Sequence, residues 1–228
     1  AVSGGWSPTV HLTCHQRGRP VWSDAIAGFV PGGNLPDGMI VTGAANGVMT
    51  LANCLQNGLN AGQQAVRDLG FKPATIKPPR AADESFAIQP FWHVKGSDKK
   101  AFVDFQNDVG VTDIKQSHRE GFRSVEHLKR YTTLGMATDQ GKIANIPGLA
   151  ILADISGKTI AETGTTIFRP PYTPVPIAAF AGRSRGKDFR PTRLTPSHKW
   201  ARAEGAEFVE TGAWLRAQWY PKTGETEW

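Results

Sequence analysis

The spacing of hydrophobic positions changes several times along this chain, which predicts short elements of mixed type. Over Ala44–Leu69 the apolar residues fall mostly three and four apart, as on one face of a helix, and Gly70 closes the pattern. Shorter apolar runs come before it. Three of them are interpreted as a β-meander and a fourth, inside Asp37–Gly43, as a lone strand: His11–Leu12, Arg17–Val21, Phe29–Val30 and Met39–Val41.

Three further helices are predicted in the middle of the chain. Thr112 is the expected N-cap of the first of them, and Gly121 is its expected C-terminal stop. Ser124 is placed to cap the second. The third fits Pro147–Ser156, with proline in its first turn and Gly157 directly after its end.

Two proline-rich stretches flank these helices. Lys72–Gln89 is charged and proline-rich, and it is interpreted as a linker or a strap over a neighbouring element. Glu162–Pro176 contains four prolines, which exclude a regular helix or a central strand and predict an extended, rigid crossing. The last predicted elements are one turn of helix, a short capped helix and two strands: Ile177–Ala181, Ser197–Gly205, Ala206–Val209 and Ala213–Trp219.

Composition limits the class of partner. The chain has 228 residues, enough for one large or two small domains, and 39% of them are hydrophobic, which is low for one compact core. Its formal charge of +6 suits an anionic partner such as a nucleotide, a nucleic acid or an acidic subunit. The positive residues are dispersed without a Lys/Arg block, which disfavours nucleic acid. The alternative is a fragment whose compensating acidic surface lies elsewhere.

The two cysteines, Cys14 and Cys54, form neither a CxxC pair nor a zinc-type spacing. This usage predicts a reducing, cytoplasmic location. The opening residues lack the basic region of a signal peptide, and no apolar run reaches the roughly 18 residues of a membrane span. We therefore expect no membrane partner.

The most informative stretch is Phe102–Gly141. Its layout resembles the small helical [2Fe-2S] domain related to bacterioferritin-associated ferredoxin, in which a Cys-x-Cys precedes two helices and a Cys-Gln-Gly-x-x-Cys follows them. Here Asp104 and Gln106 stand at the first two cysteine positions, and Asp139 and Ala144 stand at the last two. Such clusters need thiolate ligands, typically four. The resemblance therefore implies a retained scaffold without an iron–sulfur cluster.

The whole chain resembles an internal stretch of the α subunit of heterotetrameric sarcosine oxidase. Three segments in the same order carry this resemblance: GGWSPTVHL with IVTGAANGVMTLANCLQNG, then FVDFQNDVGVTDIKQSHREGFRSVEHLKRYTTLGMATDQGK with TGTTIFRPPYTPV, then LTPSHKWARAEGAEFVETGAWLRAQWYP. They resemble the close of its dinucleotide-binding region, its cysteine-free ferredoxin-like region and the start of its aminomethyltransferase-like, folate-binding domain.

The resemblance implies an α+β fold in five parts. These are the end of an NAD/FAD-type dinucleotide-binding domain, a linker, a helical domain without cluster cysteines, a proline-rich connection and the start of an aminomethyltransferase-like domain. Their predicted bounds are 1–71, 72–100, 101–160, 161–195 and 196–228.

The resemblance also implies a parent flavoprotein that oxidises the N-methyl group of sarcosine. The products would be glycine, hydrogen peroxide, and formaldehyde or methylene-tetrahydrofolate. In that family NAD is held by the α subunit, FAD and FMN sit mainly on the β subunit, and γ and δ subunits complete a heterotetramer. The same motifs occur in the equivalent subunits of related enzymes that oxidise other N-methyl amino acids.

The first candidate site is the turn from Gly43 to Leu51. Small residues between an apolar strand and a helix start leave room for a ligand at the helix N-terminus, although such turns also serve packing. The turn lacks GxGxxG and an acidic ribose ligand. On the family interpretation Gly43, Ala44, Met49 and Leu51 line NAD in the intact subunit, while this chain alone is expected to have no useful NAD affinity.

The second candidate site lies in Thr163–Pro174. Hydroxyl groups at Thr165 and Thr166 stand beside Arg169, whose guanidinium geometry suits a phosphate group. Since FMN lies near the α/β interface in the family, we expect these three residues to face that interface. The alternative is a rigid tether between domains.

No catalytic residue and no metal site is predicted. The six histidines show no ligand spacing. Asp104 and Asp139 suit a hard cation, or are ordinary solvated carboxylates at helix ends. Trp214 and Trp219 are predicted to pack in a folate-binding domain, with pterin stacking as the alternative, and to be partly exposed in this chain. The chain is thus either part of an amine-oxidising flavoenzyme or, by itself, a non-catalytic docking and linker module. The missing cysteines exclude a ferredoxin-type redox carrier.

Overall fold

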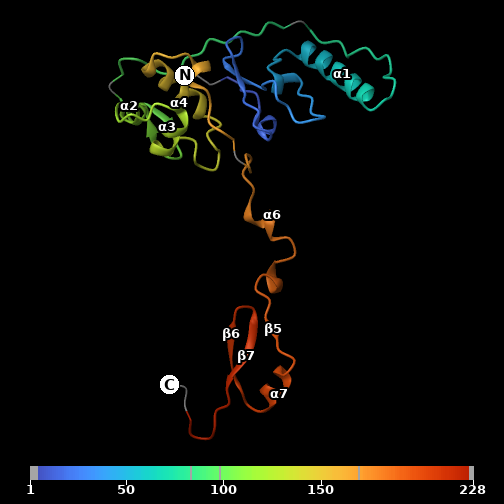
Figure 1. Ribbon diagram of the computed structural model, residues 1–228, viewed down its shortest axis with the longest axis vertical. Coiled ribbons are helices and arrows are strands. Elements are labelled where there is room, and N and C mark those ends of the chain that lie inside the picture. Colours follow the sequence, from blue (N-terminus) through green and yellow to red (C-terminus); the bar gives the residue numbers. More distant parts are fainter. Residues whose placement is uncertain (1–4, 83, 98, 169, 226–228) are drawn as a thin grey trace. The chain divides into compact units, whose positions relative to one another are not determined.

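The computed structural model describes residues 5–82, 84–97, 99–168 and 170–225 (Figure 1). Its contacts divide the chain into two compact units, Ala1–Pro174 and Val175–Trp228. Helices and strands are mixed in both units, which confirms the α+β class.

The N-terminal part of the first unit holds a 3-10 helix, η1 (His11–Cys14), and a hairpin of β1 (Val21–Ser23) with β2 (Gly28–Val30). The predicted three-stranded meander is therefore wrong. His11–Leu12 belongs to η1 and not to a strand, because the Thr13 hydroxyl donates to the Val10 carbonyl at 2.7 Å and so stabilises a turn. No strand forms over 39–42.

The long helix of this part, α1 (Leu51–Asp68), begins later than the predicted Ala44. Residues 43–46 form a separate 3-10 turn, η2 (Gly43–Asn46), because Gly47 at φ +80° interrupts the helical path. The predicted stop is confirmed, since Gly70 follows the helix at φ +81°. No residue of α1 is buried. Residues 71–84 run back along the helix without regular structure in their described part, as a strap (Figure 1).

The helical module is the best-packed part of the chain. It consists of β3 (Phe102–Asp104), β4 (Val109–Gly110), α2 (Val111–Arg119), α3 (Val125–Thr132), α4 (Asn145–Ser156) and α5 (Ile160–Thr163). Helix α2 packs against both α3 and α4 (Figure 1). Five apolar side chains form the centre of its core and are almost inaccessible to solvent: Ile114, Leu128, Leu134, Leu149 and Leu152.

The caps and stops predicted for α2, α3 and α4 agree with the structure, with one exception, although α4 begins at Asn145 instead of the predicted Pro147 and α5 was not predicted. Ser124 caps α3 by accepting the His127 N–H at 3.2 Å, and Gly157 ends α4 at φ +63°. The exception is Thr112, which lies inside α2. The N-cap of that helix is Gly110, whose N–H donates to the Asp113 carboxylate at 2.7 Å. Because the capping carboxylate belongs to Asp113, a residue inside the helix, Gly110 has no side chain from which the sequence could predict the cap.

The second unit contains α6 (Ile177–Ala181), η3 (Gly186–Asp188), β5 (Arg193–Leu194), α7 (His198–Ala203), β6 (Glu207–Thr211) and β7 (Trp214–Trp219). Strand β7 is the middle strand of a three-stranded sheet, antiparallel to β6 and parallel to β5. Trp214 is exposed and Trp219 half-buried, as the sequence predicted. Over the described part of this unit, Ala201 is the one buried residue.

Among the described residues, no helix has both the length and the apolar character needed to cross a membrane.

Candidate functional site

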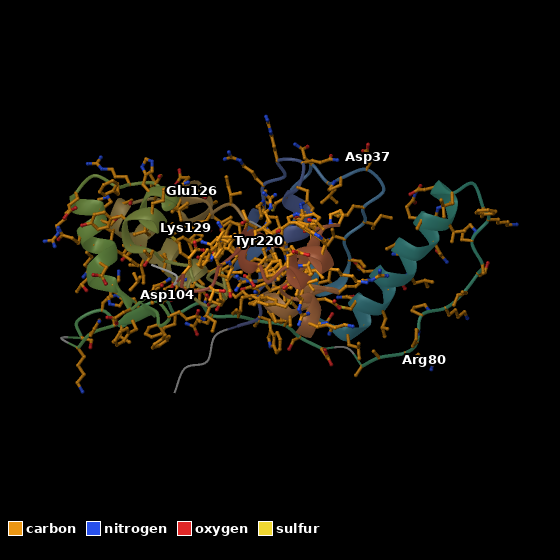
Figure 2. All side chains as sticks on the ribbon, turned by 90° about the horizontal axis from the view of Figure 1, so that it is seen from below. Asp37, Arg80, Asp104, Glu126, Lys129 and Tyr220 are labelled. Carbon is orange, nitrogen blue, oxygen red and sulfur yellow. The ribbon has the colours of Figure 1, made fainter. Side chains whose placement is uncertain are left out.

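Polar contacts join two loops of the helical module that contain no cysteine, namely the loop after β3 and the loop between α3 and α4. These two are called the cysteine-free loops below. Asp104 ends β3 and is buried, with 3% of its surface exposed. One of its oxygens, Oδ1, accepts the backbone N–H groups of Gln106 and Asn107 at 2.9 and 3.2 Å. The other, Oδ2, accepts the N–H of Gly135 at 2.8 Å. One carboxylate therefore joins two loops that are distant in sequence (Figure 2 labels Asp104).

The other three cysteine-equivalent positions hold the same two loops in different ways. The Thr138 hydroxyl donates to the Gln106 side-chain oxygen at 3.3 Å, which ties the loops a second time. Asp139 accepts the N–H of Gly141 at 3.2 Å and so shapes its own loop. Ala144 is buried at the start of α4. Hydrogen bonds and packing thus engage the four side chains that the sequence resemblance aligned with cluster cysteines.

Asn145 is a further member of this arrangement, and the sequence interpretation missed it. Its Nδ2 donates to the Gln140 carbonyl at 3.1 Å. Gly135 and Gly141 both have positive φ, and a Cβ atom at either would lie 2.3 or 2.1 Å from Asn145 Oδ1. The Asn145 amide fills the space beside Gly135 and Gly141, where neither residue has a Cβ atom. These two glycines were the sequence feature that could have predicted a side chain inserted here.

This geometry changes the interpretation of the two aspartates. Asp104 is not a solvated carboxylate at a helix end, because both of its oxygens already accept backbone N–H groups. Such a carboxylate is an acceptor that stabilises loops. Within the described residues, no group of three or more His, Cys, Asp or Glu side chains is arranged to hold a metal ion.

The proline-rich segment is fastened to the same loops. Lys142 donates to the Tyr172 carbonyl at 2.7 Å, and its ammonium lies 4.2 Å from the centre of the Tyr172 ring. That ring also packs on His11 of η1, with centroids 4.3 Å apart. Burial raises the pKa of Tyr172, and the Asp139 charge adds to this effect. Burial, followed by the charges of Lys142 and His15, lowers the pKa of His11.

The residues predicted to line NAD do lie together in one turn. Gly43 and Ala44 belong to η2, Met49 follows it, and Leu51 is the first residue of α1. A carboxylate already occupies this helix N-terminus, since Glu84 of the strap accepts the Leu51 N–H at 3.4 Å. A phosphate group could take this position only after the carboxylate moved away, because the two charges repel.

The residues predicted to face a flavin phosphate are brought together only in part. Thr166 is buried, Thr165 is half-buried, and Arg169 lies outside the described residues. The next backbone N–H, that of Ile167, donates to the Glu126 carboxylate at 2.7 Å. Glu126 also pairs with Arg130 at 3.0 Å and is labelled in Figure 2. An anion at Thr165 and Thr166 would face this carboxylate, so the described residues do not fit a phosphate.

Comparison with known proteins identifies close similarity over the full chain. Residues 98–183 match the sarcosine oxidase A3 domain. The chain is 45% identical to the sarcosine oxidase subunit alpha of Rhizobium meliloti (strain 1021), covering 100% of the chain and 23% of that protein. It is 38% and 39% identical to the subunits of the same name from Corynebacterium sp. strains P-1 and U-96, covering 99% of the chain and 24% of each relative.

The chain therefore spans about a quarter of the length of these curated relatives. Among solved structures, it resembles the L-proline dehydrogenase from P. horikoshii with a TM-score of 0.57. That likeness covers 77% of this chain and 37% of the other at 21% identity, and it shows a shared fold alone.

Proposed function

The chain is homologous to part of the α subunit of sarcosine oxidase and contains the A3 domain of that subunit, and from this we propose that it is the connecting scaffold of a flavin-dependent sarcosine oxidase. The whole enzyme oxidises the N-methyl group of sarcosine and yields glycine, hydrogen peroxide, and formaldehyde or methylene-tetrahydrofolate. This stretch contributes no catalytic residue. It connects two large domains of the α subunit and supports their contact with other subunits.

The observation that carries the scaffold role is the set of contacts at the cysteine-equivalent positions. Asp104 joins the two loops through three backbone N–H groups, and Thr138 with Gln106 joins them again. Hydrogen bonds to a buried charged group each contribute about 1.5–3 kcal/mol. A bound cluster is therefore not needed to keep the loops together, and the module acts as a structural element instead of an electron carrier.

The proposal includes the cofactors and partners of the whole enzyme. NAD binds the α subunit, FAD and FMN bind mainly the β subunit, tetrahydrofolate binds the aminomethyltransferase-like domain, and β, γ and δ subunits complete a cytoplasmic heterotetramer. Tight binding of NAD by this chain alone is not part of the proposal, because Glu84 occupies the α1 N-terminus and no residue of α1 is buried. Calorimetry that detected micromolar NAD binding to the isolated chain would overturn this point.

The five predicted domain bounds are part of the proposal as well. They divide the chain into 1–71, 72–100, 101–160, 161–195 and 196–228. Limited proteolysis of the full-length protein tests them, with cleavage expected first in the two connecting parts.

A second candidate function is the equivalent subunit of a dehydrogenase for another N-methyl amino acid. The chain has no substrate-binding residue in our proposal, so both functions predict the same structure here. Assays of the purified complex with sarcosine, and with other N-methyl amino acids as competing substrates, separate the two.

The scaffold role is tested by Asp104→Ala in the full-length protein assembled with its partner subunits. We expect lower thermal stability and fewer assembled complexes, while the complexes that do form reduce their flavin with sarcosine at the unchanged rate. The matched control is Asp108→Ala, which removes an exposed carboxylate of the same loop. Slower electron transfer in fully assembled, stable Asp104→Ala complexes would contradict a purely structural role.

A further inference from the structure

A broad cleft opens beside the cysteine-free loops in the first unit. Its volume is about 890 Å³. Three parts of the chain form most of its lining: the segment around Trp6, the described residues of 87–101 with β3 and Phe105, and the loop that leads into α4. Ala27 and Val111 also line it. The described lining residues include several large apolar side chains.

The apolar side chains of the cleft are unusually accessible. Trp6, Phe105 and Ile143 are 86%, 76% and 74% exposed. Three further apolar lining residues are also exposed: Phe91, Val94 and Phe102. The rings of Phe102 and Phe105 stack with centroids 5.6 Å apart, which makes one continuous aromatic surface. A contiguous exposed surface of this kind is typical of a protein–protein contact.

Two of these residues come from the loops that a ferredoxin uses to hold its cluster. Phe105 lies between Asp104 and Gln106, and Ile143 directly precedes Ala144. The polar side chains at the cysteine-equivalent positions fasten the loops inward, while Phe105 and Ile143 remain at the surface. The loops thus present an apolar surface in place of a redox centre.

The charged side chains that line the described part of the cleft are all lysines. The described lining residues include Lys99, Lys100 and Lys142 and no Asp or Glu. Lys100 lies 4.4 Å from the centre of the Phe102 ring and pairs with the exposed Asp108 at the edge. No ion pair is found for Lys99 within the described part of the chain. An occupant with carboxylates beside its apolar side chains matches this distribution.

We infer that this cleft, defined by Trp6, Phe91, Phe102, Phe105 and Ile143 with the three lysines, is the docking surface for a different polypeptide chain. The partner segment presents aromatic or aliphatic side chains with Asp or Glu close by. A small ligand fits less well, because small-molecule sites enclose most of the ligand, whereas these side chains stand exposed on an open surface.

A second copy of this chain also fits less well than a different chain. A twofold contact would place the same surface on both partners and so bring lysines against lysines. The inference rests on the proposed function in one respect, namely that the parent enzyme has several different subunits.

The test uses the full-length protein assembled with its partner subunits. The photo-crosslinking residue p-benzoylphenylalanine replaces Phe105 in one variant and Ile143 in another. The matched control places it at Tyr131, an exposed ring on α3 outside the cleft. We expect irradiation of the two cleft variants to crosslink a different chain, at a peptide with apolar residues next to Asp or Glu, and the Tyr131 variant not to label that peptide.

A second measurement tests the charge. The double variant Lys99→Glu, Lys100→Glu should weaken association of the partner about tenfold and reduce the salt dependence of binding. Lys158→Glu, an exposed lysine outside the cleft, should have no effect on either. Unchanged association of the double variant would overturn the charge argument.

Three results of the crosslinking would overturn the inference. These are crosslinks to another segment of the same polypeptide, crosslinks to a second copy, and an assembled complex in which neither cleft position crosslinks. Peroxide production with sarcosine is measured on the same preparations. A complex that is active but gives no crosslinks would contradict the docking surface and leave the proposed function standing. A complex that gives crosslinks but is inactive with sarcosine would contradict the proposed function and leave the docking surface standing.

Discussion

The helical module and helix α1 belong to the same unit, yet they are packed very differently. The module buries Ile114, Leu128 and Leu149 completely, whereas α1 buries none of its residues although its apolar positions follow the helical period. The second unit resembles α1, since its described part buries only Ala201. A regular pattern therefore specifies a helix without specifying what covers it. In this chain the module forms the core together with Phe29 of β2, and we expect α1 and the second unit to depend on contacts with chain segments outside these 228 residues.

Substitution in the core of the module should cause the largest loss in the free energy of unfolding. Leu149→Ala removes a fully buried side chain from α4 and should lower the free energy of unfolding by about 2–5 kcal/mol. Leu59→Ala, on the half-buried face of α1, should cost less than about 1 kcal/mol. Urea denaturation, with hydrogen exchange of the α4 and α1 amides, measures both. Equal losses would remove the contrast between the two regions.

Removal of the carboxylate that joins the two loops should cause the next largest loss in the free energy of unfolding. Asp104→Ala removes the acceptor of three backbone N–H groups. Because water can reach the partly exposed N–H groups of Gln106 and Asn107, the loss should be close to that of the one buried bond to Gly135, about 1.5–3 kcal/mol. Asp108→Ala breaks only an exposed ion pair with Lys100 and should cost about 0–1 kcal/mol. Thermal unfolding of the two variants, measured in parallel, gives the difference in their stability. A smaller loss for Asp104→Ala than for Asp108→Ala would mean that the carboxylate does not hold the loops.

Gly141 tests the role of Asn145. Gly141→Ala meets both an unfavourable φ of +73° and the Asn145 amide, and it should cost about 1–3 kcal/mol. Gly121→Ala is the control, because Gly121 also has a positive φ but nothing within 4 Å of the added Cβ atom. Its cost should be the backbone term alone, about 1 kcal/mol. If the two variants unfold at the same temperature, Asn145 does not constrain this loop.

The smallest effect should be the pH dependence of the contact between His11 and Tyr172. The pKa of His11 is lowered in the folded chain, so its neutral form is favoured there. Stability from this group is complete above the unfolded pKa of 6.5 and declines as the pH falls toward the folded value. The unfolding temperature should therefore fall less between pH 7.5 and about pH 5.5 in His11→Phe than in the unchanged chain. An identical pH profile for the two proteins would contradict the prediction.

The sequence predicted α2, α3 and α4 well because their signals are local. It did not predict β3, β4 or α5, and α5 overlaps the start of the proline-rich segment predicted to be extended. The Ser124 cap, the Gly157 stop and the proline in the first turn of α4 each depend on residues within a few positions. The η1 turn and the Gly110 cap were missed because backbone groups and a neighbouring side chain form them. At the candidate site, the sequence singled out Asp104, Gln106, Asp139 and Ala144 by their resemblance to cluster-cysteine positions, which stays a prediction. The contact of Asp104 with Gly135 and the insertion of Asn145 could not be predicted, because both depend on loops that meet only in the folded chain.

We propose that this module retains the architecture of an iron–sulfur protein and uses it as a scaffold. The most direct test is the iron and acid-labile sulfide content of the full-length complex, purified without exposure to air, with its paramagnetic spectrum after reduction. We expect flavin signals, and iron far below one equivalent per complex. Iron and sulfide at stoichiometric amounts, with a cluster signal that is lost in Asp104→Ala, would contradict this proposal.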